Sequence, residues 1–511
     1  MDNSNLYAFF EAVFKGCADE VVFEVPGIED ISYGELEWLV SKTANALRGL
    51  GIGAQHRVVT QTGKSIATVS LYLATIKIGA VYCPLNTAYT RSEIAGFLED
   101  CAPSLFICSW SASDATWELG DDFPDLQCLT LLDDGSGSFA DLVSTQSNFC
   151  ETALVGGDDV AAIVYTSGTT GPSKGAMLTH NNLVSNAQTL VTLWGFEDGD
   201  VLLHALPIYH VHGLFIALNT AFLMGMKIIW LDKFDVVEVI KFLPAASVMM
   251  GVPTYFTRLL GSGDFNQETS ANMRLFISGS APLLGETHEA FERRCGLRIL
   301  ERYGMSETGM ITSNPYQPAA GRIAGSVGFA LPNVEIRVAD EGGQILAPDE
   351  TGVLEVRGPN VFKGYWRQPE KTSAEFRDDG FFITGDLAHM DAQGRVTLVG
   401  RSKDLIISGG LNVYPKEIEL VIDELDGVLE SAVIGVPHND FGEVVVAVIV
   451  PEDTDSDLDT TAVMSSLKTQ IAGFKMPKTI IVLGELPRNA MGKVQKVRLR
   501  EDYASLFVDT R

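Results

Sequence analysis

The chain has 511 residues, of which 46% are hydrophobic, and it contains 49 glycines and 20 prolines. That length is too great for one hydrophobic core, so we expect at least two domains of an α/β enzyme rather than a disordered or fibrous chain. The formal charge of −29 repels nucleic acid and anionic membranes, so neither is an expected partner. It also repels ATP, so a nucleotide site must gather basic groups locally.

The first two-thirds of the chain alternates short β-branched runs with longer helical patterns. This alternation predicts parallel sheets covered by helices. The longest apolar run, residues 213–226, is shorter than the roughly 20 residues that cross a bilayer and contains Asn219, so we expect a buried helix and no membrane span. The predicted strands are residues 57–60, 105–108, 160–164, 227–231, 247–250 and 275–277, and the clearest helix is 66–79.

The character of the sequence changes twice after residue 320. Three runs that alternate apolar and polar residues predict a smaller antiparallel sheet or a distorted barrel: 334–338, 352–357 and 395–399. A further change at Gly400 marks a boundary, after which about a hundred residues form an α+β unit large enough to fold alone. Its expected elements are a helix at 415–426, a helix ending at 472, and strands at 430–436, 444–450 and 479–483.

Cysteine usage and the first residues of the chain indicate the compartment. The seven cysteines are scattered and form no C-x-x-C pair, so neither a zinc site nor a disulfide framework is predicted. A reducing cytoplasm is therefore the expected location. The N-terminus lacks a basic segment followed by an apolar core, so no signal peptide is expected.

The most informative segment is Tyr165-Thr-Ser-Gly-Thr-Thr-Gly-Pro-Ser-Lys-Gly175, directly after the apolar strand 160–164. Glycines let the backbone approach an anion, the hydroxyl side chains add donors, and Lys174 adds a mobile positive charge. A flexible linker is the weaker interpretation, because the lysine has no use there unless an anion binds. The spacing excludes a Walker loop, which needs a glycine, four residues and then Gly-Lys-Ser/Thr.

Four later segments carry residues suited to nucleotide chemistry. Small residues in Ser278-Gly-Ser-Ala-Pro-Leu283 follow a predicted strand and permit close approach of a base or ribose, although for this segment alone a plain strand–helix turn is the favoured interpretation. In Glu301-Arg-Tyr-Gly-Met-Ser-Glu-Thr308, the tyrosine can stack on a purine and Glu307 can hold Mg²⁺. Asp386 can accept both ribose hydroxyls, and Arg401 can bind a phosphate. Lys493, considered alone, is typical of a solvated surface turn.

Taken in order, these motifs resemble the adenylate-forming superfamily, which includes acyl-CoA synthetases, firefly luciferases and peptide-synthetase adenylation domains. The resemblance extends from about residue 30 to residue 500. It implies an α/β fold with a large N-terminal domain of two parallel-type sheets plus a small distorted β-barrel, and a smaller, mobile α+β C-terminal domain. The implied units are residues 1–400, a hinge at 401–404 that pivots at Lys403, and residues 405–511.

The resemblance also implies an acid–thiol ligase that uses ATP and CoA as co-substrates and Mg²⁺ as cofactor. A carboxylate attacks the α-phosphate of ATP, and the CoA thiol then displaces AMP from the acyl-adenylate. Lys493 would stabilise the charge of the first step, and acetylation of this lysine by an acetyltransferase is a further hypothesis. The implied catalytic residues are Lys493, Thr166, Glu307 and His210.

Three sets of binding residues follow from the resemblance. The acyl substrate set is His210, Arg258, Ser278, Ser280 and Met305, and the CoA tunnel set is Ser408, Gly409 and Gly410. The nucleotide set is Thr166, Ser167, Gly168, Thr169, Thr170, Gly171, Lys174, Ser280, Ala281, Pro282, Glu301, Arg302, Tyr303, Gly304, Met305, Ser306, Asp386, Arg401 and Lys493.

The stretches 84–90, 204–214, 358–366 and 375–382 are similar to the malonyl-CoA synthetase subfamily, so malonate or methylmalonate is the predicted acid. Arg258 lies one helical turn after Thr254, where a surface position and a pocket position are equally compatible. Facing the pocket, it would bind a second carboxylate with help from Ser278 or Ser280. The alternatives are a ligase for a short, medium-length or aromatic acid, a peptide-synthetase adenylation domain, and a non-catalytic member that only binds nucleotide. The sequence indicates no oligomeric state.

Overall fold

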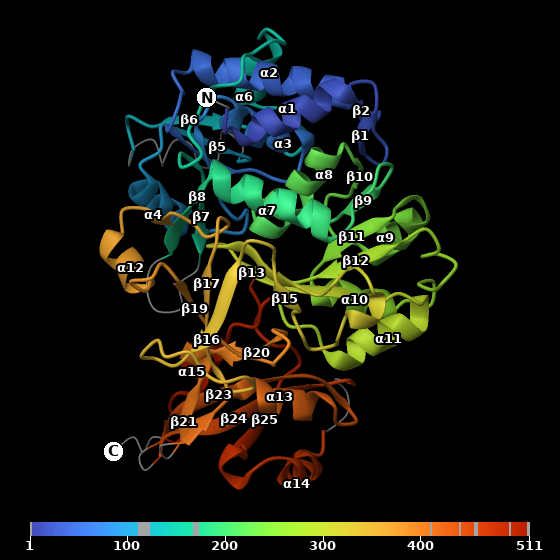
Figure 1. The fold of residues 1–511 in the computed structure, drawn as a ribbon, viewed down its shortest axis with the longest axis vertical. Helices are drawn as coiled ribbons and strands as arrows, with labels where there is room; N and C mark the ends of the chain where they lie inside the picture. The colour runs from blue at the N-terminus through green and yellow to red at the C-terminus, as the bar shows by residue number, and fades with distance from the viewer. Residues whose placement is uncertain are drawn as a thin grey trace.

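The arrangement of the chain is given by a computed structural model that describes residues 3–110, 123–166, 173–408, 411–438, 441–453, 458–489 and 492–507. Two large sheets and their helices form the upper two-thirds of the molecule, and the C-terminal part lies below them (Figure 1). In the described parts of the chain, no helix is both long and apolar enough to cross a membrane.

The first large sheet contains the strand that leads into the glycine-rich segment. Its strand order is β18-β8-β7-β4-β3-β5-β6, and the pairs among β3 to β7 are parallel. β8 pairs antiparallel with β7 and with β18, so the chain runs in opposite directions in β7 and β8. The strands are β3 (Arg57–Gln61), β4 (Val81–Pro84), β5 (Leu105–Cys108), β6 (Gln127–Thr130), β7 (Val160–Thr166), β8 (Lys174–Thr179) and β18 (Gly364–Tyr365).

The second large sheet brings several motif-bearing strand ends to one edge. Its strand order is β15-β14-β13-β12-β11-β9-β10-β1-β2, with parallel pairing from β1 to β13. Carboxyl ends of parallel strands share an edge, which is where such sheets bind ligands. The strands are β1 (Val21–Glu24), β2 (Ile31–Ser32), β9 (Val201–His204), β10 (Lys227–Trp230), β11 (Val248–Gly251), β12 (Leu275–Ser278), β13 (Leu300–Met305), β14 (Gly309–Ser313) and β15 (Phe329–Ala330).

Helices cover these sheets as the alternating pattern predicts. The predicted helix at 66–79 is present as α3, which ends at Lys77. The helices of this part are α1 (Leu6–Gly16), α2 (Tyr33–Gly49), α3 (Ile66–Lys77), α4 (Arg91–Cys101), α6 (Ser138–Ser144), α7 (His180–Leu193), α8 (Asn219–Met224), α9 (Val236–Phe242), α10 (Pro253–Leu260), α11 (Gly285–Cys295) and α12 (Pro369–Ala374).

The apolar run 213–226 forms the buried helix that we expected, but its helix type changes along its length. It begins as a π-helix over His212–Leu218 and continues as α8, and the whole π-helical segment is buried. His204 Nε2 lies 3.0 Å from the carbonyl oxygen of Gly213, so this carbonyl bonds to a side chain at the start of the helix. A π-helical turn is wider than an α-turn and is frequently found at functional sites.

The third sheet is the antiparallel one that the alternation after residue 320 predicts. Its four strands have the order β16-β17-β19-β20. In the register of the last pair, Asp386 lies opposite Arg401. The strands are β16 (Glu335–Ala339), β17 (Gly352–Arg357), β19 (Phe382–Met390) and β20 (Val396–Arg401).

The C-terminal part has its own sheet and its own hydrophobic core. Two separate clusters of buried residues, all from residue 406 onward, pack on the two faces of this sheet. A separate core is what an independently folding unit requires. Its elements are β21 (Ile406–Ser408), β22 (Leu411–Val413), α13 (Pro415–Asp423), β23 (Val428–His438), β24 (Gly442–Pro451), α14 (Thr460–Gln470), β25 (Thr479–Val482) and α15 (Lys496–Tyr503).

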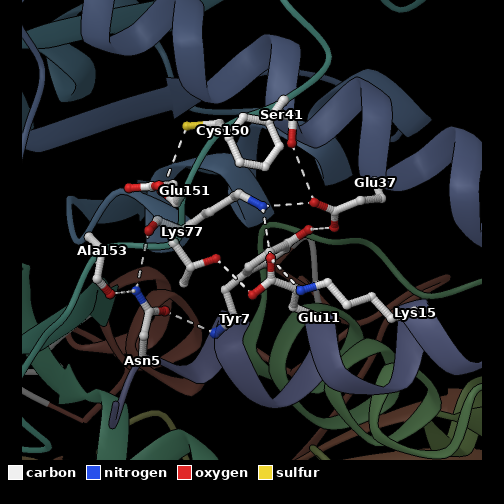
Figure 2. Close-up of polar contacts among 12 residues, drawn as sticks. Asn5, Tyr7, Glu11, Lys15, Glu37, Ser41, Lys77, Cys150, Glu151 and Ala153 are labelled. Carbon is white, nitrogen blue, oxygen red and sulfur yellow. Dashed lines mark hydrogen bonds and ion pairs between the residues drawn. The ribbon is translucent and has the colours of Figure 1, made fainter.

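A buried lysine fastens the first helix to the body of the molecule. Figure 2 shows the ammonium of Lys77, whose side chain is fully buried, directed at Glu37 Oε1 at 2.8 Å and at Glu11 Oε1 at 3.6 Å. The same ammonium lies 4.4 Å from the ring centroid of Tyr7. The Asn5 amide donates hydrogen bonds of 2.9 Å to Ile76 O and 3.1 Å to Ala153 O. These contacts join α1 to α2, α3 and the segment near residue 153.

Candidate active site

The base of the glycine-rich hairpin lies beside Glu307. Thr166 ends β7 and pairs in register with Lys174 at the start of β8. The Thr166 hydroxyl lies 3.4 Å from Glu307 Oε1, which joins the first motif to the third. The remaining predicted members of the hairpin lie outside the described residues: Ser167, Gly168, Thr169, Thr170 and Gly171.

A tyrosine connects Glu307 to the hairpin lysine. The Tyr365 hydroxyl lies 3.2 Å from Glu307 Oε1 and 2.7 Å from Glu375 Oε2. Lys174 Nζ lies 3.0 Å from Glu375 Oε1 and 4.9 Å from the ring centroid of Tyr365. Burial raises the pKa of Glu307. Burial would also raise the pKa of Glu375, but hydrogen bonds from Tyr365, Lys174 and Lys371 outweigh it and lower the pKa.

Asp386 is oriented by two neighbours at the edge of the third sheet. Arg401 Nε lies 2.9 Å from Asp386 Oδ1, and the Tyr303 hydroxyl donates to Asp386 Oδ2. The Asp386 carboxylate raises the pKa of Arg401. Glu301, in the same strand as Tyr303, instead accepts a 3.3 Å hydrogen bond from Gly325 N. Burial raises the pKa of Glu301 to about 8.

A buried guanidinium from the middle of β13 lies beside the carboxyl end of β12. Arg302 is 3% exposed, and its Nε and Nη2 have no hydrogen-bond partner among the described residues. A Cβ atom at Gly279 would come within 2.2 Å of Arg302 Nη1, so any larger residue there would displace the guanidinium from its present position. Ser278 Oγ also lacks a partner within the described chain. Burial lowers the pKa of Arg302 to about 9.

Two histidines line the same region in their neutral form. Ser280 Oγ lies 3.2 Å from His212 Nδ1. Burial, followed by repulsion from Arg302, lowers the pKa of His212 well below its ordinary value. Burial, followed by repulsion from Lys493, lowers the pKa of His210 to about 3. His210 is therefore an uncharged imidazole at neutral pH, and its ring packs 4.5 Å from that of Tyr209.

The C-terminal part contributes Lys493 to this group. The lysine side chain is exposed by surface area, yet its ammonium interacts electrostatically with Arg401, Asp386, Glu307 and Arg302. Burial of the ammonium, followed by repulsion from Arg401, lowers the pKa of Lys493. The backbone before it lies against α10, since a Cβ at Gly492 would be 3.8 Å from Thr254 Oγ1.

Arg258 lies on the exposed face of α10, one turn after Thr254. Neither a hydrogen bond nor an ion pair links it to the described residues, but its charge interacts with Tyr255, which also interacts with Tyr209. Arg258 therefore lies on the same side of α10 as Thr254, the residue next to Gly492, and its guanidinium is open to solvent.

The remaining predicted site residues lie at loop ends around this group. Gly304 and Met305 end β13, Ser306 follows in the turn to β14, and Ala281 and Pro282 follow β12. Lys403 lies in a short 3-10 helix, Ser402–Asp404, where Arg500 Nη1 contacts Asp404 Oδ1 at 3.1 Å. Burial lowers the pKa of Lys403 to about 8. Ser408 ends β21, and its predicted neighbours Gly409 and Gly410 lie outside the described residues.

Sequence reasoning did not assign roles to Tyr365 and Glu375. Both fall in stretches that served only to indicate a subfamily, 358–366 and 375–382. Tyr365 stands directly before a tryptophan, and Glu375 stands at a helix end. Neither position indicates a functional role in the sequence. Their contacts with Lys174 and Glu307 depend on the pairing of β18 with β8, which the sequence pattern does not reveal.

Comparison with known proteins identifies the family. A model described as AMP-binding enzyme matches residues 9–366, and one described as AMP-binding enzyme C-terminal domain matches residues 417–493. ATP-bound MatB from Rhodopseudomonas palustris is 50% identical, covers 99% of this chain and 100% of its own, and superposes with a TM-score of 0.96. The apo structure of the same protein superposes with a TM-score of 0.83.

Two curated relatives extend over nearly the whole chain. The malonate–CoA ligase of Arabidopsis thaliana is 32% identical over 98% of this chain and 89% of its own length. The indoleacetate–CoA ligase of Aromatoleum aromaticum is 32% identical over 92% of this chain and 93% of its own length. The chain therefore belongs to the AMP-binding enzyme family, as an ATP-dependent, AMP-forming acid–thiol ligase.

Proposed function

We propose that the chain converts malonate, ATP and CoA into malonyl-CoA, AMP and pyrophosphate, and accepts methylmalonate in the same way. The observation that carries this proposal is the buried guanidinium of Arg302, which has two unpartnered nitrogens within the described chain. A buried, unpaired charge is costly, so the site favours a ligand that supplies an anion. The second carboxylate of malonate supplies one, in the planar geometry that a guanidinium binds best.

Other groups support the same assignment. Ser278 offers a buried hydroxyl without a partner in the described chain, and Arg258 offers a solvent-exposed guanidinium on the side of α10 that carries Thr254. We assign Arg302 as the buried anchor of the second carboxylate and Arg258 as a contact that completes the clamp when the acid binds. The malonate–CoA ligase of Arabidopsis thaliana, 32% identical over 98% of the chain, is consistent with this choice.

The first chemical step uses the residues around Lys493. An oxygen of the malonate carboxylate attacks the α-phosphate, forming the acyl-phosphate bond, and the bond to pyrophosphate breaks. The Lys493 ammonium would stabilise the negative charge that gathers on the phosphate oxygens, and Asp386 would accept the ribose hydroxyls. His210, uncharged at neutral pH, would line the acyl pocket rather than act as a base.

Glu307 suits a Mg²⁺ ion that is bound mainly by phosphates. Among the described residues no group of three or more acidic, histidine or cysteine side chains could hold a metal by itself. Mg²⁺ at nucleotides needs only one or two carboxylates, with phosphates and water as the other ligands. The buried Glu307 carboxylate beside the Thr166 hydroxyl meets that need, and the ion would neutralise charge on the phosphates.

We infer that the second step follows a rotation of the C-terminal part about Lys403. The CoA thiolate then attacks the carbonyl of the malonyl-adenylate, and the bond to AMP breaks. The two steps need different groups around one carbonyl, so removal of Lys493 and arrival of Ser408 would convert one site into the other. The higher TM-score to ATP-bound MatB (0.96) than to its apo form (0.83) is consistent with an arrangement suited to the first step.

A ligase for another acid is the second candidate. The indoleacetate–CoA ligase of Aromatoleum aromaticum is as identical to this chain, at 32%, as the malonate–CoA ligase is. An aromatic monocarboxylate has no second anion for Arg302, so this candidate leaves the buried guanidinium without a partner.

The test measures pyrophosphate release with malonate, methylmalonate, acetate, propionate and indoleacetate, with and without CoA. We expect malonate or methylmalonate to give the highest kcat/KM. In Arg302→Met, kcat/KM for malonate should fall at least about 100-fold while activity on propionate changes less than about fivefold. Arg258→Ala should lower malonate activity about tenfold. Arg298→Met, which removes an arginine paired with Glu292, is the matched control.

The outcomes separate the candidates. Equal activity on propionate and malonate, or an equal loss on both acids in Arg302→Met, contradicts the malonate assignment. A rise in KM for ATP with no change in acid preference gives Arg302 the nucleotide role that the sequence suggested. Because replacing a buried unpaired charge by an apolar side chain is neutral or stabilising, Arg302→Met should not lower the thermal midpoint of unfolding.

A further inference from the structure

The hairpin lysine already has an anionic partner inside the protein. Lys174 Nζ lies 3.0 Å from Glu375 Oε1, and both side chains are about one-fifth exposed, at 20% and 22%. From the sequence, we expected the partner of Lys174 to be a bound anion. The structure therefore places a carboxylate at the lysine that is assigned to the phosphates of ATP.

The carboxylate of Glu375 is held from three directions. Oε1 contacts both Lys174 and Lys371 Nζ at 3.0 Å, and Oε2 accepts a 2.7 Å hydrogen bond from the Tyr365 hydroxyl. Tyr365 is fixed in turn, because β18 pairs with β8 and sets Tyr365 opposite Ala176, two residues after Lys174. Glu375 thus keeps two partners, Lys371 and Tyr365, when Lys174 moves away.

We propose that Glu375 is an internal substitute for the nucleotide phosphates, which holds Lys174 in place in the free enzyme and is displaced when ATP binds. The proposal rests on the nucleotide role of Lys174 within the proposed function. Glu375 does not react; it is a positioning residue that acts through Lys174.

Lys371 keeps the charge of Glu375 neutralised while Lys174 changes partners. Without it, moving the Lys174 ammonium to a phosphate would leave a partly buried carboxylate with a hydroxyl group alone as its partner. Lys371 lies one helical turn before Glu375, so the carboxylate keeps a cation at 3.0 Å throughout the exchange. Glu375 therefore opposes ATP binding only by the strength of one ion pair, and Lys371 weakens that opposition further.

Calorimetric titration of the full chain with ATP, in the absence of any acid and CoA, tests the proposal. Glu375→Gln keeps the shape and the hydrogen bond to Tyr365 but removes the charge that competes for Lys174. We expect the Kd for ATP to decrease about three- to tenfold, the worth of one partly buried ion pair. The matched control is Glu238→Gln in α9. It removes a glutamate that pairs at 3.0 Å with Lys241 of the same helix, and it should leave the Kd unchanged.

A double-mutant cycle separates this role from a general effect of charge. Lys371→Ala should raise the Kd for ATP about two- to fivefold, because Glu375 then holds Lys174 more strongly. In the Glu375→Gln background the same substitution should have no effect. Equal effects of Lys371→Ala in both backgrounds overturn the proposal, because Lys371 would then act on ATP directly.

Unchanged or weaker ATP binding in Glu375→Gln, with a thermal midpoint equal to that of the parent protein, also overturns the proposal. If the midpoint falls, Glu375→Asp, which keeps the charge on a shorter side chain, should bind ATP with a Kd between those of the parent and Glu375→Gln. These titrations need no turnover, so they are independent of the acid. A protein that binds ATP as expected but releases no pyrophosphate with malonate contradicts the proposed function and leaves this inference intact.

Discussion

Arg401 Nε lies 2.9 Å from Asp386 Oδ1, across the last pair of strands in the third sheet. The Tyr303 hydroxyl donates to the other carboxylate oxygen, so both oxygens of Asp386 are oriented before a nucleotide arrives. An oriented carboxylate loses little entropy when it accepts the two ribose hydroxyls.

Asp386→Asn should therefore raise the KM for ATP about 10- to 100-fold, because charge-assisted hydrogen bonds to the ribose are lost. Isotope exchange between pyrophosphate and ATP measures this step without CoA. Asp379→Asn, which removes a half-exposed carboxylate paired with Arg337, is the control and should leave the KM unchanged. An equal rise in both variants would contradict a ribose contact.

Lys493→Ala should separate the two half-reactions. Loss of the ammonium that interacts with Asp386 and Glu307 should slow malonyl-adenylate formation about 100- to 1,000-fold. Thioester formation from added malonyl-adenylate and CoA should change less than about threefold, because Lys493 is not needed in that step. Lys475→Ala, which removes a lysine paired with Glu417 in the same part of the chain, is the control. A similar loss in both half-reactions would refute the separate role.

Glu301 should make stability depend on pH. Its pKa rises from the ordinary value of 4.5 to about 8 in the folded protein, so the folded chain holds a proton that the unfolded chain releases. Between those two values the free energy of unfolding should fall as pH rises, by about 1.4 kcal/mol per pH unit for this one group.

Glu301→Gln keeps a neutral side chain and should remove that slope. Urea unfolding at several pH values between 5 and 8 compares the two proteins, and the difference between their free energies of unfolding should grow with pH in favour of the variant. The exposed Glu289→Gln serves as control. Parallel pH profiles of parent and Glu301→Gln would show that Glu301 ionises normally.

The lysines around Glu11 offer a matched pair for stability. Lys77 is fully buried and reaches both Glu37 and Glu11, whereas Lys15 is 70% exposed and reaches Glu11 alone at 3.3 Å. Lys77→Ala should lower the free energy of unfolding by about 3 kcal/mol, through an unpaired carboxylate and a cavity. Lys15→Ala should lower it by less than about 0.5 kcal/mol. Equal effects would mean that the buried network does not hold α1.

Short apolar runs in the sequence predicted much of the fold, because such a run marks a strand that is buried along its whole length. The strand at Leu105–Cys108 has the predicted bounds, and all four of its residues are buried. Asp386 and Arg401 had separate predicted roles, at the ribose and at a phosphate, and their position opposite each other in β19 and β20 was not predicted. The π-helix at His212–Leu218 was not predicted, because no polar side chain follows His212 and no period separates the segment from an α-helix.

The site was predicted less completely, because its decisive contacts join distant segments. Arg302 lies in a motif that suggested the nucleotide, and only its burial beneath Gly279 reveals an unmatched charge. The partnership of Lys174 with Glu375 spans 201 residues and depends on how α12 packs beside the hairpin. No periodicity in a single sequence encodes such a contact.

The anchoring of α1 sets an order of events during synthesis. Besides the contacts of Asn5 and Tyr7, Leu6 N donates to His180 Nδ1 at 3.1 Å, and α1 packs against α8, which ends at Met224. α1 contacts α2 and α3 as well as α8, so part of its apolar surface is covered early, but the part that meets α8 stays open until the chain has been made as far as Met224. During that interval the sides of Phe10 and Phe14 that later pack against Phe222 are available to chaperones, so α1 is fixed in stages rather than at once.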